Sequence, residues 1–134
     1  FPTRRSSDLV SPEAMEWIAG KLELEPIQVY EVVTFYPMFK LSPVGRKHVK
    51  VCRTLSCALQ GAYQVCKAFQ DELDCPEGST TEDGEYTLEF VECIASCGTA
   101  PVIQIGEEMI EKVTPERARE IARELKAVNT EASN

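Results

Sequence analysis

The sequence of 134 residues predicts an α/β fold with a β-α-β-β-α core, preceded by a short helical segment. Two kinds of observation support this order. Short apolar runs with strand character alternate with longer stretches whose apolar residues repeat every three or four positions. Ser-Pro and Thr-Pro pairs, at 11–12 and 114–115, mark the starts of two of those stretches. The hydrophobic content of 43% is enough for one core.

Two helices are predicted ahead of the core. Ser-Pro-Glu at 11–13 supplies an N-cap, a proline at the first helical position and an acid in the first turn, so this helix should run to about Leu22. A second helix should begin near Pro26. Its expected buried face, spaced at i, i+4 and i+7, consists of Val29, Val33 and Tyr36.

The core should contain four strands and two helices. The expected strands are His48 to Cys52, Tyr86 to Glu92, Val102 to Ile105 and Met109 to Val113. A helix that starts near Cys57 should bury a stripe made of Leu59, Ala62, Cys66, Phe69 and Leu73. The last helix, capped by Thr114, should bury Ala118, Ile121, Ala122, Leu125 and Val128.

Charge and composition exclude several classes of function. The net charge is -8, which argues against nucleic acid as a partner. No apolar run approaches the roughly 20 residues needed to cross a bilayer, so direct membrane insertion is not expected. The sequence also lacks a dinucleotide-binding glycine motif, a P-loop and a C-x-x-C pair. We therefore expect neither nicotinamide nor flavin to bind this chain.

The first nine residues, FPTRRSSDL, match the translation of a common sequencing-adapter primer. We interpret residues 1–9 as an artefact and leave them out of the fold prediction. On this interpretation the natural chain starts upstream of Val10, and the stretch that would carry any targeting peptide is absent from this sequence.

Four cysteines form two short clips, Cys52 with Cys57 and Cys93 with Cys97, each following a predicted strand. This placement puts four thiolates at one end of a sheet. Such soft ligands select zinc or an iron-sulfur cluster over magnesium or calcium. The gaps of four and three residues lean toward iron-sulfur, because structural zinc sites favour the tight C-x2-C knuckle. A zinc-stabilised interaction module remains the alternative.

The cysteine pattern, C-x4-C followed by C-x3-C-G-x-x-P, resembles that of the thioredoxin-like 2Fe-2S ferredoxin family. The segments VYEVVTFYPMFKLSPVGRKHVKVC and EFVECIASCGTAPVIQIG are similar to the family's two ligand regions. The resemblance implies a thioredoxin-like 2Fe-2S ferredoxin domain over residues 46–128. A truncated helical segment and linker at 10–45 would precede it, and a tail at 129–134 would follow.

The resemblance also implies a function. Cys52, Cys57, Cys93 and Cys97 would hold one 2Fe-2S cluster, and the chain would transfer electrons within the NADH-oxidising module of respiratory complex I. The implied partners are the flavin-bearing NADH-oxidising subunit and other peripheral-arm subunits. The implied location is cytoplasmic, at the inner face of the membrane and held there by the complex. Equivalent subunits of NAD-linked hydrogenases and formate dehydrogenases are the alternative setting.

Residues beside the clips carry further expectations. A helix N-terminus should favour the Cys57 thiolate, and Gly98 should let the chain turn close to the cluster. The cation of Arg53 should raise the reduction potential. Four hydroxyl groups should either donate to sulfur or bond their own backbone: Thr54, Ser56, Ser96 and Thr99. Cys66 and Cys75 are expected to be structural.

Overall fold

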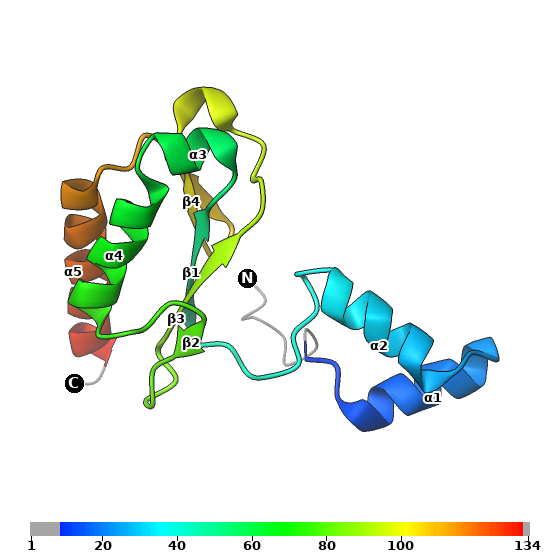
Figure 1. The fold of residues 1–134 in the computed structure, drawn as a ribbon. Helices are drawn as coiled ribbons and strands as arrows, with labels where there is room; N and C mark the ends of the chain where they lie inside the picture. The colour runs from blue at the N-terminus through cyan, green and yellow to red at the C-terminus, as the bar shows by residue number, and fades with distance from the viewer. Residues whose placement is uncertain (1–8, 133–134) are drawn as a thin grey trace. The chain divides into compact units, whose positions relative to one another are not determined.

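A computed structural model describes residues 9–132, except for the side chains of 129–132. The chain forms two compact units, of which the first ends at Pro43 and the second begins at Val44 (Figure 1). Residues 1–8 of the proposed adapter segment lie outside the described residues. Leu9, the last residue of that segment, forms an isolated parallel bridge with Lys40 inside the first unit.

The first unit is a pair of helices, α1 (Pro12–Leu22) and α2 (Pro26–Phe35), as predicted. The Ser11 hydroxyl accepts a hydrogen bond from the backbone N–H of Ala14 at 3.2 Å, which confirms the N-cap. A small core of four buried residues joins the helices: Met15, Ala19, Val29 and Val33. The prediction that Tyr36 shares this face is wrong. Tyr36 caps α2 in an extended conformation, so the helical period no longer applies, and its side chain is exposed.

The second unit contains a mixed sheet in the order β2-β3-β1-β4-β5. Its strands are β1 (Lys47–Cys52), β2 (Ser79–Thr80), β3 (Tyr86–Val91), β4 (Ile103–Ile105) and β5 (Glu108–Ile110). β1 and β3 run parallel, with Cys52 opposite Val91, whereas β4 pairs with β1 in the antiparallel sense. Because β1 and β3 are parallel neighbours, the segments that follow them leave the sheet at the same edge.

The helix predicted after the first clip is two helices, α3 (Leu55–Leu59) and α4 (Ala62–Leu73). Gly61 separates them with a φ of 101°, a left-handed conformation that ends one helix and starts the next. α4 buries Cys66, Phe69 and Leu73 as predicted. Leu59 is 78% exposed, so its assignment to the buried stripe is wrong.

The final helix, α5 (Pro115–Ala132), packs beside α4 on the sheet (Figure 1). It buries Ala118, Ile121 and Ala122, as predicted. Val128 is exposed, because the 12 residues of α4 are too short to cover an 18-residue helix along its whole length. The predicted tail at 129–134 needs correction, since the helix continues to Ala132. The bond between Ala100 and Pro101 is cis.

Candidate metal centre

The four clip cysteines lie where the parallel strands leave the sheet. Cys52 is the last residue of β1 and Cys57 lies in α3. Cys93 follows β3 by two positions, and Cys97 begins the short 3-10 helix η2 (Cys97–Thr99). Two backbone hydrogen bonds hold this edge together: Cys52 N–H donates to Val102 at 3.1 Å, and Arg53 N–H donates to Val91 at 3.0 Å.

The thiols are arranged as two pairs. The sulfur atoms of Cys93 and Cys97 lie 3.7 Å apart, and those of Cys52 and Cys57 are in hydrogen-bonding contact. The contact with Cys93 raises the pKa of Cys97, and the nearby Cys52 of the other pair adds a smaller contribution in the same direction. Among residues 9–132, no three His, Cys, Asp or Glu side chains converge as on a single metal ion. Two separate thiol pairs suit a two-iron cluster, because each iron takes two protein ligands.

The two pairs differ in exposure. Cys52 and Cys57 are each 2% exposed, whereas Cys93 and Cys97 lie at the surface. One end of the site is therefore embedded in the core between β1 and α3, and the other faces outward. A cluster held by all four would be partly shielded from water, with its outer end open to a partner.

The buried cysteines, Cys52 and Cys57, form the inner pair, and their pKa values are shifted in opposite directions. Burial acts to raise the pKa of Cys52, but hydrogen bonds from the Thr54 side chain and from the Thr54 and Ile94 N–H groups bring it below its ordinary value. Burial raises the pKa of Cys57 above its ordinary value, against the N–H of Val102. Cys57 lies in the first turn of α3, as predicted, but burial outweighs the N–H donor and leaves its thiolate disfavoured overall.

The four predicted hydroxyl groups divide into two sets. Thr54 Oγ1 lies 3.2 Å from the sulfur of Cys52, and Ser56 hydrogen-bonds Cys97. Ser96 and Thr99 instead lie against a carboxylate oxygen of Glu111, and Thr99 Oγ1 is also 3.1 Å from the backbone carbonyl oxygen of Ser96, the local contact left open by the sequence. Sequence reasoning missed Glu111, which lies 15 residues after Ser96 and 12 residues after Thr99. No local pattern in the sequence marks a contact over that distance.

The turn inside the second clip is made by Ala95 and not by Gly98. Ala95 has a φ of 62°, the left-handed region that L residues seldom adopt, and its N–H donates to the sulfur of Cys93 at 3.3 Å. Gly98 does not have a positive φ, and a Cβ there would meet no atom within 4 Å. Gly98 therefore does not supply the left-handed turn, and its close approach to the cluster stays a prediction.

The other two cysteines are buried away from the clips, as predicted. Cys66 is packed into the main core, and its burial raises the pKa of its thiol to about 12. The Cys75 thiol lies 3.5 Å from the carbonyl oxygen of Ser79. Cys66 behaves as a small apolar residue, whereas the Cys75 thiol also contacts backbone oxygens.

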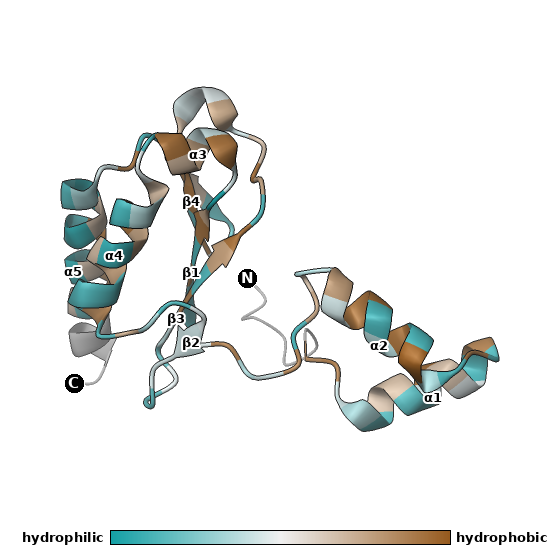
Figure 2. Cartoon of the chain, in the orientation of Figure 1, coloured by the Kyte–Doolittle hydropathy of each residue, from teal (hydrophilic) through white to brown (hydrophobic). Residues whose placement is uncertain are grey.

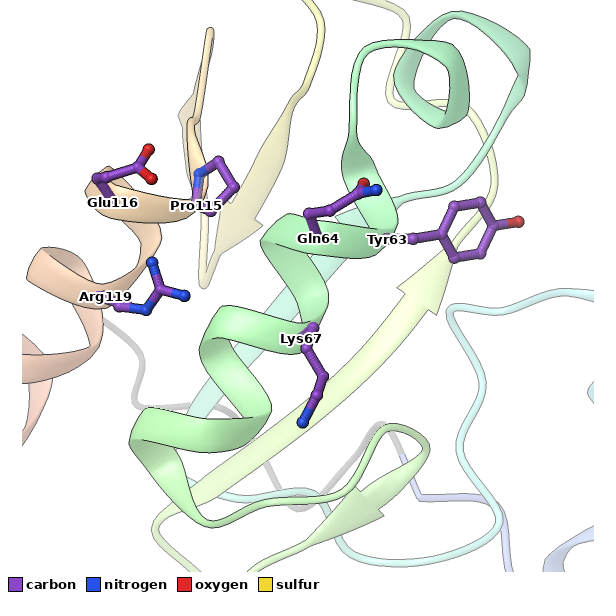
Figure 3. A pocket seen from close by; sticks show the side chains of 6 residues that line it. All are labelled: Tyr63, Gln64, Lys67, Pro115, Glu116 and Arg119. Carbon is purple, nitrogen blue, oxygen red and sulfur yellow. The ribbon is translucent and has the colours of Figure 1, made fainter.

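A separate hollow of about 400 Å³ lies between α4 and α5 (Figure 3). Its lining comprises Tyr63, Gln64, Lys67, Pro115, Glu116 and Arg119. Lys67 already pairs with Asp71, and Arg119 interacts with Glu116. Both cations of this hollow therefore have acidic neighbours. None of the clip cysteines lines it, so it does not form part of the thiol site.

The sequence matches the family model of thioredoxin-like 2Fe-2S ferredoxins over residues 3–126. The chain belongs to this family. It therefore takes one 2Fe-2S cluster as its cofactor, which decides between the iron-sulfur and zinc interpretations of the cysteine spacing. The soft donor set of two thiol pairs fits such a cluster.

Relatives of this ferredoxin are components of larger oxidoreductases. The E subunit of NADH-quinone oxidoreductase from Rickettsia bellii is 36% identical over 92% of this chain and 74% of its own length. The NADP-reducing hydrogenase subunit HndA of Solidesulfovibrio fructosivorans is 33% identical over 84% of this chain and 66% of its own length.

The fold is also similar to that of a solved NAD+-reducing NiFe hydrogenase chain, with a TM-score of 0.70 over 87% of this chain. Sequence identity is 16%, so this likeness shows the fold alone, and the matched part is 20% of the hydrogenase chain. In the part of the ferredoxin that the structure describes, no helix is long and apolar enough to cross a bilayer.

Proposed function

We propose that this ferredoxin is the electron-transfer subunit of the NADH-oxidising module of NADH-quinone oxidoreductase. Cys52 and Cys57 would hold one iron of its cluster, and Cys93 and Cys97 the other. The observation that carries this assignment is the convergence of the two thiol pairs at the carboxyl edge of the parallel strands β1 and β3.

A bound 2Fe-2S cluster accepts and returns single electrons, and the protein sets its potential and its distance to the next centre. Here the chain embeds the inner pair and exposes the outer pair. The backbone N–H groups of Thr54, Ile94, Ala95 and Val102 point at sulfur atoms of the site. These donors would stabilise the thiolate charge in a partly desolvated site and tune the potential.

The proposed partner is the flavin-bearing NADH-oxidising subunit, because within residues 9–132 we recognise no nicotinamide or flavin motif. Two apolar surfaces are available for contact. On the first unit, Trp17, Ile27 and Phe35 are 67%, 59% and 78% exposed. Hydrophobic residues occupy much of α2 (Figure 2). Beside the inner cysteines, Leu55 and Leu59 are 75% and 78% exposed. Large apolar side chains exposed on both units favour a protein that binds a partner over one that functions as a free monomer.

This assignment would place the protein at the cytoplasmic face of the membrane, held there by its complex. Contacts to other peripheral-arm subunits would follow from the same membership. The second candidate is the equivalent subunit of an NAD-linked hydrogenase or formate dehydrogenase. The 33% identity to the hydrogenase subunit HndA supports the hydrogenase version of this second candidate.

Anaerobic purification tests the cluster assignment. A red-brown protein with two irons and two sulfides per chain is expected, whereas a colourless protein that contains zinc would overturn it. NADH alone should leave the oxidised spectrum unchanged, while NADH with the flavin-bearing subunit of complex I should bleach it. Rapid bleaching by NADH of flavin-free protein would exclude a dependent electron-transfer role. Pairing with the flavoprotein of a hydrogenase but not with that of complex I would favour the second candidate.

A further inference from the structure

The carboxylate of Glu111 reaches from the segment after β5 back to the second cysteine clip. One oxygen, Oε1, accepts a hydrogen bond from Thr99 Oγ1 at 2.6 Å and another from Ser96 Oγ. The two hydroxyl oxygens also lie 2.7 Å from each other. Ser96 directly precedes Cys97, so the carboxylate holds the residue next to a proposed ligand.

Backbone bonds continue this attachment along the chain. The N–H of Lys112 donates to the carbonyl of Thr99 at 2.8 Å, and the N–H of Val113 donates to that of Pro101 at 3.0 Å. The segment 111–113 therefore runs beside 99–101, and Glu111 extends the pairing toward Ser96 by its side chain. The clip is also held by the Ala95 N–H bond to Cys93 and by the Ser56 contact with Cys97, but both of its cysteines are exposed.

We propose that Glu111 is a positioning residue of the cluster site, which fixes the 93–97 clip and keeps the hydroxyls of Ser96 and Thr99 away from cluster sulfur. This inference rests on the proposed ligand set. Each hydroxyl has a single proton, so a hydroxyl that donates to the carboxylate cannot also donate to a sulfur. The inner clip lacks such a competitor, and Thr54 there contacts Cys52 directly.

Glu111 should lower the midpoint potential of the cluster in two ways. Its negative charge disfavours the added electron. Its capture of two hydroxyls withholds hydrogen bonds that would stabilise the reduced cluster. Loss of the carboxylate should therefore raise the midpoint potential and loosen the clip.

The test compares Glu111→Ala, Glu111→Gln and Thr99→Val with the wild-type holoprotein. Glu111→Ala should raise the midpoint potential, change the electron paramagnetic resonance (EPR) spectrum of the reduced cluster, and speed loss of iron to a chelator several-fold. Glu111→Gln keeps an acceptor oxygen, so its EPR spectrum and iron loss should stay close to wild type while the potential rises less. Thr99→Val removes one of the two hydroxyls and should shift the EPR spectrum and iron loss in the direction of Glu111→Ala.

Glu107→Ala is the matched control, because it removes the same charge from an exposed acid in the turn before β5. Its EPR spectrum and iron loss should equal those of the wild type. The inference is overturned if Glu111→Ala matches this control in all three measurements. If Glu111→Ala assembles no cluster, Thr99→Val becomes the deciding variant. A wild-type EPR spectrum and wild-type iron loss in Thr99→Val would then exclude a positioning role for Glu111. A colourless wild-type protein would instead overturn the proposed function.

Discussion

Arg53 and Glu92 form an ion pair that joins the two cysteine clips. Arg53 follows Cys52 and Glu92 precedes Cys93, and the guanidinium donates through Nη2 and Nε to Oε1 of the carboxylate at 2.8 and 3.1 Å. The sequence alone predicts Arg53 to act as an isolated cation beside the cluster. The structure pairs it with Glu92, which lies beside the other clip, so the two charges largely cancel at the proposed cluster site.

The first prediction follows from this cancellation. Arg53→Gln should lower the midpoint potential and Glu92→Gln should raise it, each by an amount on the order of tens of millivolts. The double variant should return close to the wild-type value. Both side chains are more than half exposed, so the single shifts should shrink as salt is added. Film voltammetry at two ionic strengths measures them, and single shifts of the same sign would contradict the pairing.

The second prediction separates ligand from core cysteines. Cys57 and Cys66 are equally suitable for comparison, since both are buried and lie on consecutive helices. Cys57→Ser should abolish or severely distort the visible spectrum of the cluster. Cys66→Ser should keep that spectrum at a modest cost in stability, because it buries a hydroxyl in the main core. A spectrum lost in Cys66→Ser but kept in Cys57→Ser would reverse the assignment.

The third prediction concerns the reactivity of Cys66. With a pKa raised to about 12 by burial, its thiol remains protonated at neutral and mildly alkaline pH. Roughly one molecule in ten thousand would carry the thiolate at pH 8, and the thiolate is the nucleophile. Iodoacetamide should therefore leave Cys66 unmodified in the native holoprotein and label it after denaturation, as read by peptide mass spectrometry. Rapid native labelling would show that the core around α4 opens readily.

The parts of the structure that could be predicted from the sequence are those with local causes. Ser11 and Thr114 mark helix starts because a cap acts over three residues. The cysteine clips converge because each follows a strand and the two strands are parallel neighbours. Gly61 is visible in the sequence as a glycine inside a helical pattern, and it is a local signal for the break after Leu59.

Tyr36 and Leu59 were missed for local reasons, at a helix end and at a helix break. The other parts that failed depend on contacts between distant residues. Glu111 reaches Ser96 across 15 positions, and no periodicity encodes that contact. Val128 keeps the apolar spacing of α5 but extends past the helix that would cover it. The charge of Arg53 is likewise balanced by Glu92, which is 39 residues away in sequence and adjacent only because β1 and β3 pair.

The fourth prediction concerns the entry to β1. A Cβ at Gly45 would lie 2.7 Å from the backbone carbon of Tyr86 and 2.9 Å from that of Glu85. Gly45→Ala should therefore push β1 and β3 apart and lower the free energy of unfolding by about 1–3 kcal/mol. Gly20→Ala in α1 is the control, because a Cβ there meets nothing within 4 Å and favours the helix. Denaturant unfolding followed by circular dichroism should show a lower midpoint only for Gly45→Ala.

The last prediction tests the helical unit as a docking surface. Phe35 is 78% exposed at the end of α2, whereas Val33, two residues earlier, is 6% exposed in the core of the helix pair. Phe35→Asp should keep the helical content and the cluster spectrum, since it alters only a surface side chain. It should weaken NADH-driven reduction through the flavin-bearing partner, because a carboxylate would have to be desolvated at the interface.

Val33→Asp is the contrasting variant, and it should disrupt the helix pair itself while the cluster in the separate second unit assembles normally. Loss of coupling in both variants, with helicity lost only in Val33→Asp, is the expected outcome. Deletion of residues 11–36 should reproduce the coupling defect. Full coupling in Phe35→Asp and in the deletion variant would move the docking surface to Leu55 and Leu59, which Leu55→Asp would then test directly.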